Sequence, residues 1–451
     1  MTPAEISHLY SRATMSVSFA GFQGSLKSNR QQLVQQLFEQ SKNYTLLSVD
    51  FTGLTSDTKK IDRKKLQGKL QELRLEWTKK LISGNEALRE RMTFFWHNHF
   101  ACRINNPHAL LELNNVTRTL AFAPFKELLV AVSKTPAMLS FLNNQVNRKE
   151  HPNENFAREL LELFTIGRGN YSETDIKEAA RAFTGWGFKR DTYEFVFRAE
   201  QHDDGIKSFM GKQGNFSGED IIDIVLEKKE TARYLCRKMF GHFVSEAVPE
   251  KTVNEYAEFY YSTNYHTGKL IEKLFLSDFF YEKKHFSAII KSPVELLVGL
   301  NKSFPISWSK PESLLYIQRI TGQLLFNPPN VAGWPGGKNW IDSSSLMFRL
   351  KLPSLLVNNG IIGVEAPHDN DEMPGVNATA EKIQKKVAAK TGARVEWEVV
   401  EKIYEGVDKK ELATYFVPAG IAEQKLELFA ENASLKELIV KIISLPEYQL
   451  G

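Results

Sequence analysis

Apolar residues recur at intervals of three and four along most of the chain, which is the spacing of one face of an α-helix. Residues 29–42, for example, place Leu33, Val34 and Leu37 on one face, and residues 62–83 continue the pattern over a long segment. The same spacing predicts further helices over 6–13, 85–100, 107–122, 125–133, 136–143, 172–184, 217–229, 230–245, 250–262, 266–277, 291–303, 311–324, 343–350, 381–391, 395–404, 408–416 and 434–444. The pattern therefore predicts a mainly α-helical protein with few short strands.

Alternating apolar and polar residues, the pattern of a half-buried strand, occur in only two places. Residues 192–199 place Tyr193, Phe195 and Phe197 on one side and are the best hairpin candidate. Residues 394–400 alternate weakly, so the C-terminal segment is expected to be helical or α+β. No repeat of fixed period is visible.

The segment 153–165 is predicted to be a helix with both ends marked. Asn153 or Asn155 can cap its start, and Gly167 stands where a left-handed C-terminal residue belongs. One face is apolar, whereas the other concentrates charged residues beside His151. This charged stripe is either a buried polar network or a functional site.

A polar stretch over 363–378 interrupts the helical pattern and is expected to be a linker or insertion. It divides the chain into a main helical domain over 1–362 and a C-terminal segment over 379–451. We expect the C-terminal segment to pack against the main domain.

The composition of the 451 residues is that of a soluble globular protein, with 42% hydrophobic and 25% charged residues. A net charge of +4 argues against a dedicated nucleic-acid binder. Two cysteines exclude a disulfide scaffold. No signal peptide and no transmembrane segment of roughly 18 apolar residues is apparent. The sequence as it stands predicts a cytoplasmic protein, or an exported one if an N-terminal leader is missing.

Four sequence blocks carry a resemblance to a known family. They are Phe95–Phe100 (FWHNHF), Glu154–Gly167 (ENFARELLELFTIG), His202–Gly211 (HDDGIKSFMG) and Asn327–Trp340 (NPPNVAGWPGGKNW). In order and spacing the chain resembles the bacterial family called domain of unknown function 1800. The resemblance implies a fold more than a chemistry, because the family has no settled activity. It also implies a genomic association with a sulfatase-like family, and hence a sulfatase-like partner protein, and family members often look exported.

His97 and His99 are two residues apart, so a continuous helix directs them to nearly opposite faces. His99 shares a face with Phe95 and Trp96, which predicts that it is buried. Two interpretations remain open for this pair. It either contains a core histidine bonded to a neighbouring carboxylate or takes part in a metal or catalytic site.

Glu159 and Glu162 lie three apart and so share a helix face, an arrangement that can bind a divalent metal or act as acid and base. The structural alternative is a network in which Arg158 pairs with Glu154 or Glu162. Arg181 is expected to insert among the carboxylates of the preceding helix.

The last two blocks also contain candidate site residues. Gly205 predicts a turn, from which His202, Asp203 and Lys207 would project as metal and anion ligands. The Pro- and Gly-rich block has the composition of a sugar-binding surface, or alternatively of a tryptophan-anchored structural loop. Its candidate binding residues are Asn330, Trp334, Lys338 and Trp340.

No nucleophile elbow, phosphate loop, dinucleotide fingerprint or HExxH motif is present. Two function classes remain. The first is a hydrolase or lyase acting on a polar polymer through a cleft, with a divalent metal left open as cofactor. Its catalytic candidates are His99, Glu159, Glu162, His202, Asp203 and Lys207. Its metal-ligand candidates are His97, His99, Glu159, His202 and Asp203, and its further binding candidates are Arg158 and Arg181. The enzyme hypothesis predicts that His99, Glu159 and His202 line one pocket, with Asp203 nearby. The second class is a non-catalytic scaffold or partner protein whose charge network is structural.

Overall fold

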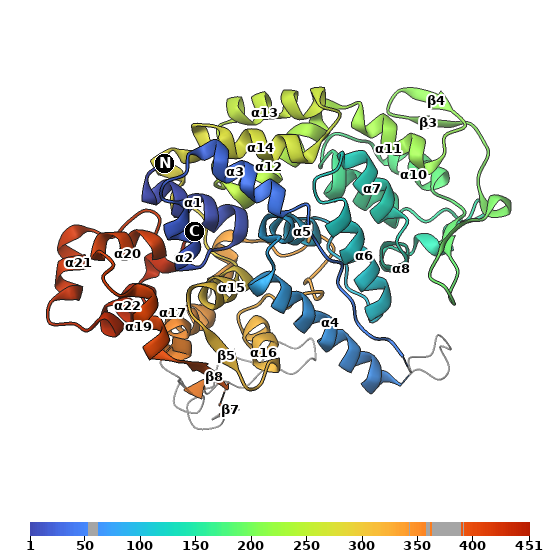
Figure 1. Ribbon diagram of the computed structural model, residues 1–451. Coiled ribbons are helices and arrows are strands. Elements are labelled where there is room, and N and C mark those ends of the chain that lie inside the picture. Colours follow the sequence, from blue (N-terminus) through green and yellow to red (C-terminus); the bar gives the residue numbers. More distant parts are fainter. Residues whose placement is uncertain (53–61, 342, 358–360, 363–388, 391) are drawn as a thin grey trace.

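The computed structural model describes residues 1–52, 62–341, 343–357, 361–362, 389–390 and 392–451. Helices dominate these residues, and the strands are short and form small two-stranded sheets, which confirms the mainly α-helical prediction (Figure 1). The predicted linker at 363–378 and nearly all of the predicted helix at 381–391 lie outside the described residues.

The N-terminal part is a cluster of helices around α5. The helices are α1 (Pro3–Thr14), α2 (Phe19–Ser25), α3 (Arg30–Gln40), α4 (Arg63–Ser83), α5 (Ala87–His99), α6 (Pro107–Thr119), α7 (Phe125–Ser133) and α8 (Pro136–Phe141), followed by the 3-10 turn η1 (Asn144–Val146). Helix α5 contacts α1, α3, α4 and α6, and nearly all of its side chains are buried. It therefore places its histidines in the interior of the molecule. The short α2 was not predicted, because two of its seven residues are glycines, which are poor helix formers.

The predicted helix 153–165 begins as α9 (Asn155–Glu159) but continues as the π-helix η2 (Leu160–Thr165). Its ends lie where the sequence indicates. The Oδ1 atom of Asn153 accepts the backbone N–H of Asn155 at 3.0 Å, and Gly167 is left-handed with φ +79°. The next helix, α10 (Glu173–Ala182), begins at the predicted Ser172 capping box.

Two small antiparallel hairpins follow. Strand β1 (Trp186–Phe188) pairs with β2 (Phe195–Phe197), and β3 (Lys207–Phe209) pairs with β4 (Lys212–Gly214); the 3-10 turn η3 (Ala199–Gln201) lies between the hairpins. The predicted strand near 192–199 is therefore confirmed over 195–197. Tyr193 instead lies in the turn, with φ +62°. The β3–β4 hairpin was not predicted.

A second set of helices completes the main part of the chain. They are α11 (Gly218–Leu226), α12 (Lys229–Phe243), α13 (Glu250–Ser262), α14 (Thr267–Leu276), α15 (Pro293–Ser303), α16 (Glu312–Ile320) and α17 (Ser343–Val357), with the 3-10 turns η4 (Phe279–Tyr281), η5 (Lys283–His285) and η6 (Gly337–Trp340) and strand β5 (Ile306–Trp308). Helices α12 and α13 pack side by side. The segment between α16 and η6 has no helix or strand, as its proline and glycine content predicts.

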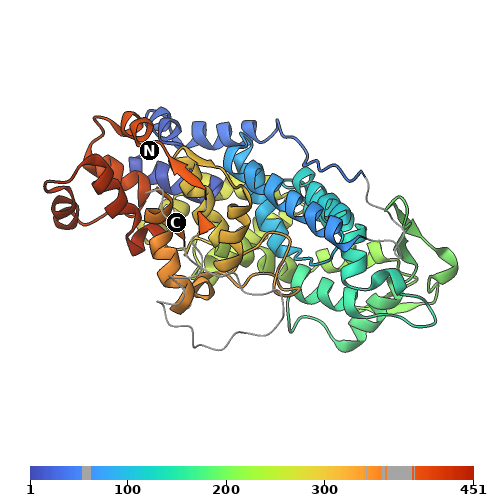
Figure 2. The same ribbon diagram turned by 90° about the horizontal axis from the view of Figure 1, so that it is seen from below.

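The C-terminal helices lie beside the N-terminus at one end of the molecule, and the hairpins lie at the other (Figures 1 and 2). They are α19 (Trp397–Tyr404), α20 (Lys409–Phe416), α21 (Glu423–Ala430) and α22 (Leu435–Ile443), with the 3-10 turn η7 (Pro446–Gln449) and strands β6 (Ile361–Ile362), β7 (Ala389–Lys390) and β8 (Ala393–Val395). Strand β6 pairs with β7 and β8 pairs with β5, all antiparallel. The weak alternation at 394–400 thus corresponds to a strand only at its start, and the rest is α19.

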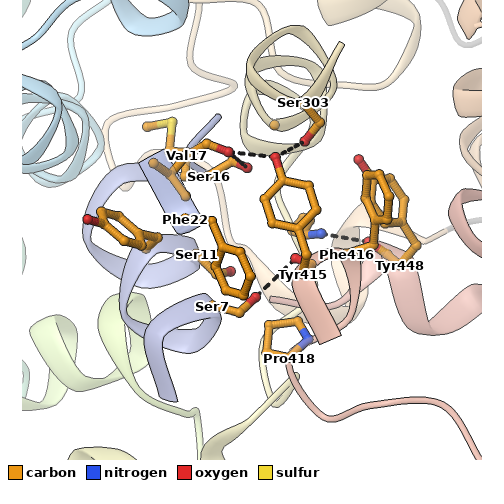
Figure 3. A pocket seen from close by; sticks show the side chains of 14 residues that line it. Ser7, Ser11, Ser16, Val17, Phe22, Ser303, Tyr415, Phe416, Pro418 and Tyr448 are labelled. Carbon is orange, nitrogen blue, oxygen red and sulfur yellow. Dashed lines mark hydrogen bonds between the residues drawn. The ribbon is translucent and has the colours of Figure 1, made fainter. Parts of the chain in front are cut away.

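The contact between the two ends of the chain is specific. Helix α20 packs on α1, α19 on α2, and α22 on α17. Figure 3 shows Tyr415 at this junction, where its hydroxyl is 2.7 Å from the carbonyl oxygen of Val17 and 3.1 Å from the Oγ of Ser303. The Oγ of Ser7 donates to the Tyr415 carbonyl at 3.0 Å. The cavity left here is only about 30 Å³, too small for an organic ligand.

Candidate functional site

A much larger cavity, of about 590 Å³, lies among α5, α12, residues 289–295 and the loop 332–340. This volume is within the range of about 300–1,000 Å³ that is typical of small-molecule sites. Its aromatic lining residues are Phe94, Phe95, Trp334 and Trp340. Its polar lining residues are Asn98, His99, Lys238, His242, Glu246, Ser292, Glu295, Gln323, Lys338 and Asn339.

Asn98 fixes the Pro- and Gly-rich loop on α5. Its Oδ1 accepts the backbone N–H of Trp334 at 2.8 Å, and its Nδ2 donates to the Trp334 carbonyl at 3.3 Å. Gly333, at φ +81°, packs so closely that a Cβ there would overlap Asn98. Trp334 and Trp340 are consequently only 5% and 8% exposed, which makes this segment a packed loop whose rings form a wall of the cavity.

His99 joins the cavity to the π-helix. Its Nε2 donates to the backbone carbonyl of Phe164 at 3.1 Å, one of the carbonyls that a helix leaves unpaired at its C-terminal end. This bond places the ring proton on Nε2, so Nδ1 carries the lone pair, and Nδ1 has no hydrogen-bond partner. Burial lowers the pKa of His99 well below its usual value, so the ring is neutral. The expected bond to a carboxylate is replaced by a bond to the main chain.

Helix α12 supplies the opposite wall. The hydroxyl of Tyr234 donates to the carbonyl of Leu163 at 2.8 Å, so α5 and α12 satisfy consecutive carbonyls of the same π-helix. Lys238 follows one turn later, with its Nζ 5.5 Å from the centre of the Tyr234 ring. Burial lowers the pKa of Lys238 to about 8. None of the ion pairs among the described residues involves Lys238.

His242 lies one further turn along α12 and has an unpaired Nε2. Burial, reinforced by the positive charges of Arg91 and Arg12, keeps its pKa well below the usual value. Arg91 donates to the His242 carbonyl at 3.3 Å and forms a buried ion pair with Glu295. Glu295 also accepts the backbone N–H of Ser292 at 2.6 Å, in the capping box that begins α15. The carboxylate on this wall is therefore already neutralised.

The sequence-predicted residues are distributed over several places. His97 faces away from the large cavity. Its Nε2 accepts the N–H of Phe326 at 3.2 Å, and its ring meets Trp77 edge-on. Burial lowers the pKa of His97 to about 3. The divergence of His97 and His99 follows from the helical geometry expected for residues two apart.

The charged stripe of α9 and η2 is a network close to the surface. Arg158 pairs with Glu154 at 3.1 Å and with Glu173 at 2.9 Å, not with Glu162. The Arg158 side chain is 36% exposed, so the network is not buried. Glu162 instead pairs with Arg168 and accepts a hydrogen bond from the hydroxyl of Tyr171.

Glu159 is half-buried, and burial together with the charge of Glu162 raises its pKa. Neither glutamate lines the large cavity. The large cavity therefore does not bring this pair to a ligand, as the expected metal or acid–base role would require.

The block that begins at His202 forms a closed network of its own. His202 bonds through Nδ1 to the Thr184 carbonyl at 2.9 Å, and Asp203 holds Arg181 at 2.7 Å. Lys207 does not project from a loop. It lies in β3, fully buried, and donates to three oxygen atoms, including the Asp203 carbonyl at 2.5 Å. Arg181 also pairs with Glu178 of its own helix, so the prediction that it inserts among carboxylates of the preceding helix is wrong.

His99, Glu159 and His202 were expected to line one pocket. Of the three, only His99 lines the large cavity. Across the part of the chain that the structure describes, no three His, Cys, Asp or Glu side chains are placed to hold one metal ion. The metal set His97, His99, Glu159, His202 and Asp203 is thus not brought together. Asn330 is also absent from the cavity lining, whereas Trp334, Lys338 and Trp340 belong to it.

Sequence reasoning missed the contribution of α12. Tyr234, Lys238 and His242 recur at four-residue intervals and therefore form one stripe along that helix. This stripe was the available signal, since a lysine and a histidine on the side that turns toward the core need partners or a function. Asn98, between the two histidines, was the other missed residue.

The architecture defines a class of protein: a mainly helical chain whose aromatic and basic side chains surround one sizeable cavity. A family model described as "Protein of unknown function (DUF1800)" matches residues 8–450. The chain therefore belongs to the DUF1800 family. No curated protein and no solved structure matches it significantly. No helix within the described ranges is long and apolar enough to cross a membrane.

Proposed function

We propose that the cavity is the active site of an enzyme, a hydrolase or lyase, that cleaves a polar polymer. The observation that carries the proposal is the composition of the cavity. Its lining includes two tryptophan rings and the side chains of His99, Lys238 and His242. One ring nitrogen of each histidine has no hydrogen-bond partner, and Lys238 has no ion pair among the described residues. Polar and titratable groups that converge beside aromatic side chains in a cavity of this size are typical of a catalytic site.

His99 is the group best prepared for proton transfer. Its proton is held on Nε2 by the Phe164 carbonyl, so Nδ1 carries the lone pair of a base, and a movement of the ring or its neighbours would present this buried atom to a substrate. A positioned base of this kind contributes about 10²–10⁴-fold to a reaction rate. Lys238, with a pKa of about 8, can hold or release a proton near neutral pH. Either elimination or hydrolysis can use such a pair.

The tryptophan wall supports a polymer of sugar units as substrate. Flat, apolar sugar faces pack on indole rings, and Trp334 and Trp340 are fixed in place by the loop anchored at Asn98. Lys338 and Asn339 are exposed residues of the same loop and can bond hydroxyl groups at the cavity mouth. In this proposal the networks around Arg158 and Arg181 are structural.

The alternative function is that of a non-catalytic scaffold for a protein partner, of the sulfatase-like kind that the family resemblance implies. The observation favouring it is that two of the four family blocks, those at Glu154 and His202, form charge networks outside the large cavity.

The test is an activity screen of the purified protein on a panel of neutral and acidic polysaccharides. Hydrolysis is read as new reducing ends and elimination as absorbance of the unsaturated product. We expect cleavage of at least one polymer, and a loss of at least about 100-fold in His99→Gln. The control is His97→Gln, which changes a neighbouring histidine outside the cavity and should keep the rate. No cleavage by the parent protein, or an unaffected His99→Gln, overturns the proposal in favour of the scaffold.

A further inference from the structure

We infer that the ligand of this cavity carries a negative charge, as an acidic sugar unit with a carboxylate or sulfate ester, and that Lys238 is its counter-ion. The inference rests on the proposed function only in taking the cavity as the ligand site. It does not depend on whether the ligand is cleaved.

The first argument is the contrast between the half-buried Lys238 and three other lysines that are partly or fully buried. Lys291 donates to the Tyr448 carbonyl at 2.7 Å, Lys302 to the Thr14 carbonyl at 2.7 Å, and Lys207 to three oxygens. The fold thus bonds each of these ammonium groups to oxygen atoms. Lys238 contacts the Tyr234 ring, whose centre lies 5.5 Å from its Nζ, and no oxygen of the described residues accepts from it. The residue is half-buried and lines the cavity, so its charge is only partly solvated and an anion from outside would be stabilised here.

The second argument is the charge of the surrounding wall. Of the two cavity carboxylates, Glu295 is neutralised by Arg91, and Glu246 is on an exposed residue held against Gly337 at the loop. The charge of Arg91 is offset by Glu295, but Arg12, which forms no ion pair among the described residues, is also close enough to His242 to lower its pKa, so positive potential reaches the cavity wall. The interior of the cavity is therefore positive, which favours an anionic ligand over a neutral one.

The third argument is the presence of two more nitrogen atoms without partners. His99 Nδ1 and His242 Nε2 are both buried at this cavity and unpaired. His99 feels the charge of Lys238, and His242 is one helical turn from it. Both rings lie in the wall beside the position at which Lys238 would hold the anionic group. The adjoining Trp334 and Trp340 give the same wall an apolar part, which favours an organic anion over a bare inorganic one.

The experiment is isothermal titration with oligosaccharides of equal length under conditions without turnover. One is a galacturonate oligomer, one a sulfated oligomer and one a neutral glucose oligomer. We expect at least one acidic oligomer to bind tenfold or more tightly than the neutral one, and added salt to weaken that difference. Comparing the carboxylate and sulfate oligomers identifies the anionic group.

The variant is Lys238→Met, which keeps the length of the side chain and removes the charge. We expect it to lose at least tenfold in affinity for the acidic oligomer and to change less than threefold for the neutral one. The matched control is Lys251→Met, which removes an exposed charge from the adjacent helix α13 and should leave both affinities unchanged. Unfolding of Lys238→Met in urea should occur at the same or a higher denaturant concentration, because a partly buried charge without an ion-pair partner has been removed.

Equal affinity for acidic and neutral oligomers, or undiminished acidic binding by Lys238→Met, overturns the inference. Cleavage of a neutral polymer without an acidic preference would support the enzyme and still overturn the anionic ligand. Tight acidic binding without cleavage would support the anionic ligand and count against the enzyme.

Discussion

His97 and His99 show how strongly surroundings decide the role of a residue. Both are on α5 and both are buried, yet His97 is enclosed by Trp77 and Phe326 while His99 faces a cavity. In both rings burial opposes the charged form and lowers the pKa. The difference lies in the ring lone pairs. The lone pair of His97, on Nε2, accepts a hydrogen bond, whereas the lone pair of His99, on Nδ1, does not. Only the second arrangement leaves chemistry available.

The buried neutral state of His97 makes the folded protein sensitive to acid. Its pKa is about 3 in the folded state against the usual 6.5, so between these values the unfolded chain binds more protons and stability falls as the pH falls. At pH 5 this contribution is roughly 2 kcal/mol, from about 1.5 pH units at 1.36 kcal/mol each. Between pH 7 and pH 5 the parent should therefore lose about 2 kcal/mol more unfolding free energy than His97→Gln, which lacks this histidine. Urea titrations at the two pH values measure it, and an unchanged difference would contradict it.

At the scale of elements, the π-helix η2 is the feature that local signals did not predict. Both ends of the segment carry recognisable signals, but the wider turn depends on what meets its C-terminal carbonyls. Those of Leu163 and Phe164 are taken by Tyr234 and His99 from two other helices. The Oγ1 of Thr165 also bonds back to Leu160 at 2.6 Å. π-Turns are frequent at functional sites. Because η2 is bonded to His99, which lines the cavity, its position agrees with the proposed site.

Two neighbouring glycines separate backbone strain from packing at the end of this element. Gly167 and Gly169 both have positive φ, +79° and +84°, but a Cβ at Gly167 would come 2.8 Å from the Tyr234 ring, whereas the space at Gly169 is open. Gly169→Ala should therefore cost about 1 kcal/mol, the strain of a left-handed residue. Gly167→Ala should cost at least about 1 kcal/mol more, because Tyr234 must move. Denaturant unfolding of both variants measures the difference, and equal losses would show that the Tyr234 contact carries no weight.

At the scale of the whole molecule, the two ends of the chain pack together. Helices α1 and α2 lie against α19 and α20, and Figure 3 shows Tyr415 reaching across this junction. Residues nearly 400 positions apart are thus hydrogen-bonded in the interior. We expect the N-terminal and C-terminal helices to unfold in one transition.

Tyr415→Phe tests this junction. It removes the hydroxyl that bonds Val17 and Ser303 and leaves the partly buried Val17 carbonyl without that donor, which should cost about 1–3 kcal/mol of unfolding free energy. The control is Tyr261→Phe, whose hydroxyl makes one exposed bond of 3.3 Å to the Glu227 carbonyl and should cost less than about 0.5 kcal/mol. Circular dichroism during urea unfolding gives both values. Two separate transitions, or equal costs, would show that the ends of the chain are not coupled through Tyr415.

Much of the fold was predictable because its signals are local. Helix starts at Ser172, Ser217 and Ser434 are confirmed by capping boxes, and the left-handed Gly167 by its φ angle. Each of these signals involves residues only a few positions apart, and the energies that decide them act within one turn of helix. The short α21 was missed because it buries only Leu426, so its sequence shows no apolar face with a helical period.

The site was only partly predictable. Sequence reasoning found His99, Trp334, Lys338 and Trp340, and the structure places all four on one cavity. It expected Glu159 and His202 beside them, because family blocks rich in charge were taken as parts of one site. His202 instead bonds to Thr184, and Glu159 lies half-buried beside Glu162, away from the cavity lining.

By itself, the sequence determined the helical class, the positions of most helices and the family, since these depend on periodicity and on short runs of residues. Only the tertiary structure decided which polar groups remain without partners. Asp203 and Glu162 pair with nearby arginines, whereas Lys238 has no carboxylate partner among the described residues. That difference depends on how α5, α12 and the loop at Trp334 pack. The physical reason is that desolvation and pairing are set by all neighbours in space, and the neighbours of Lys238 come from segments up to about a hundred and forty residues away along the chain.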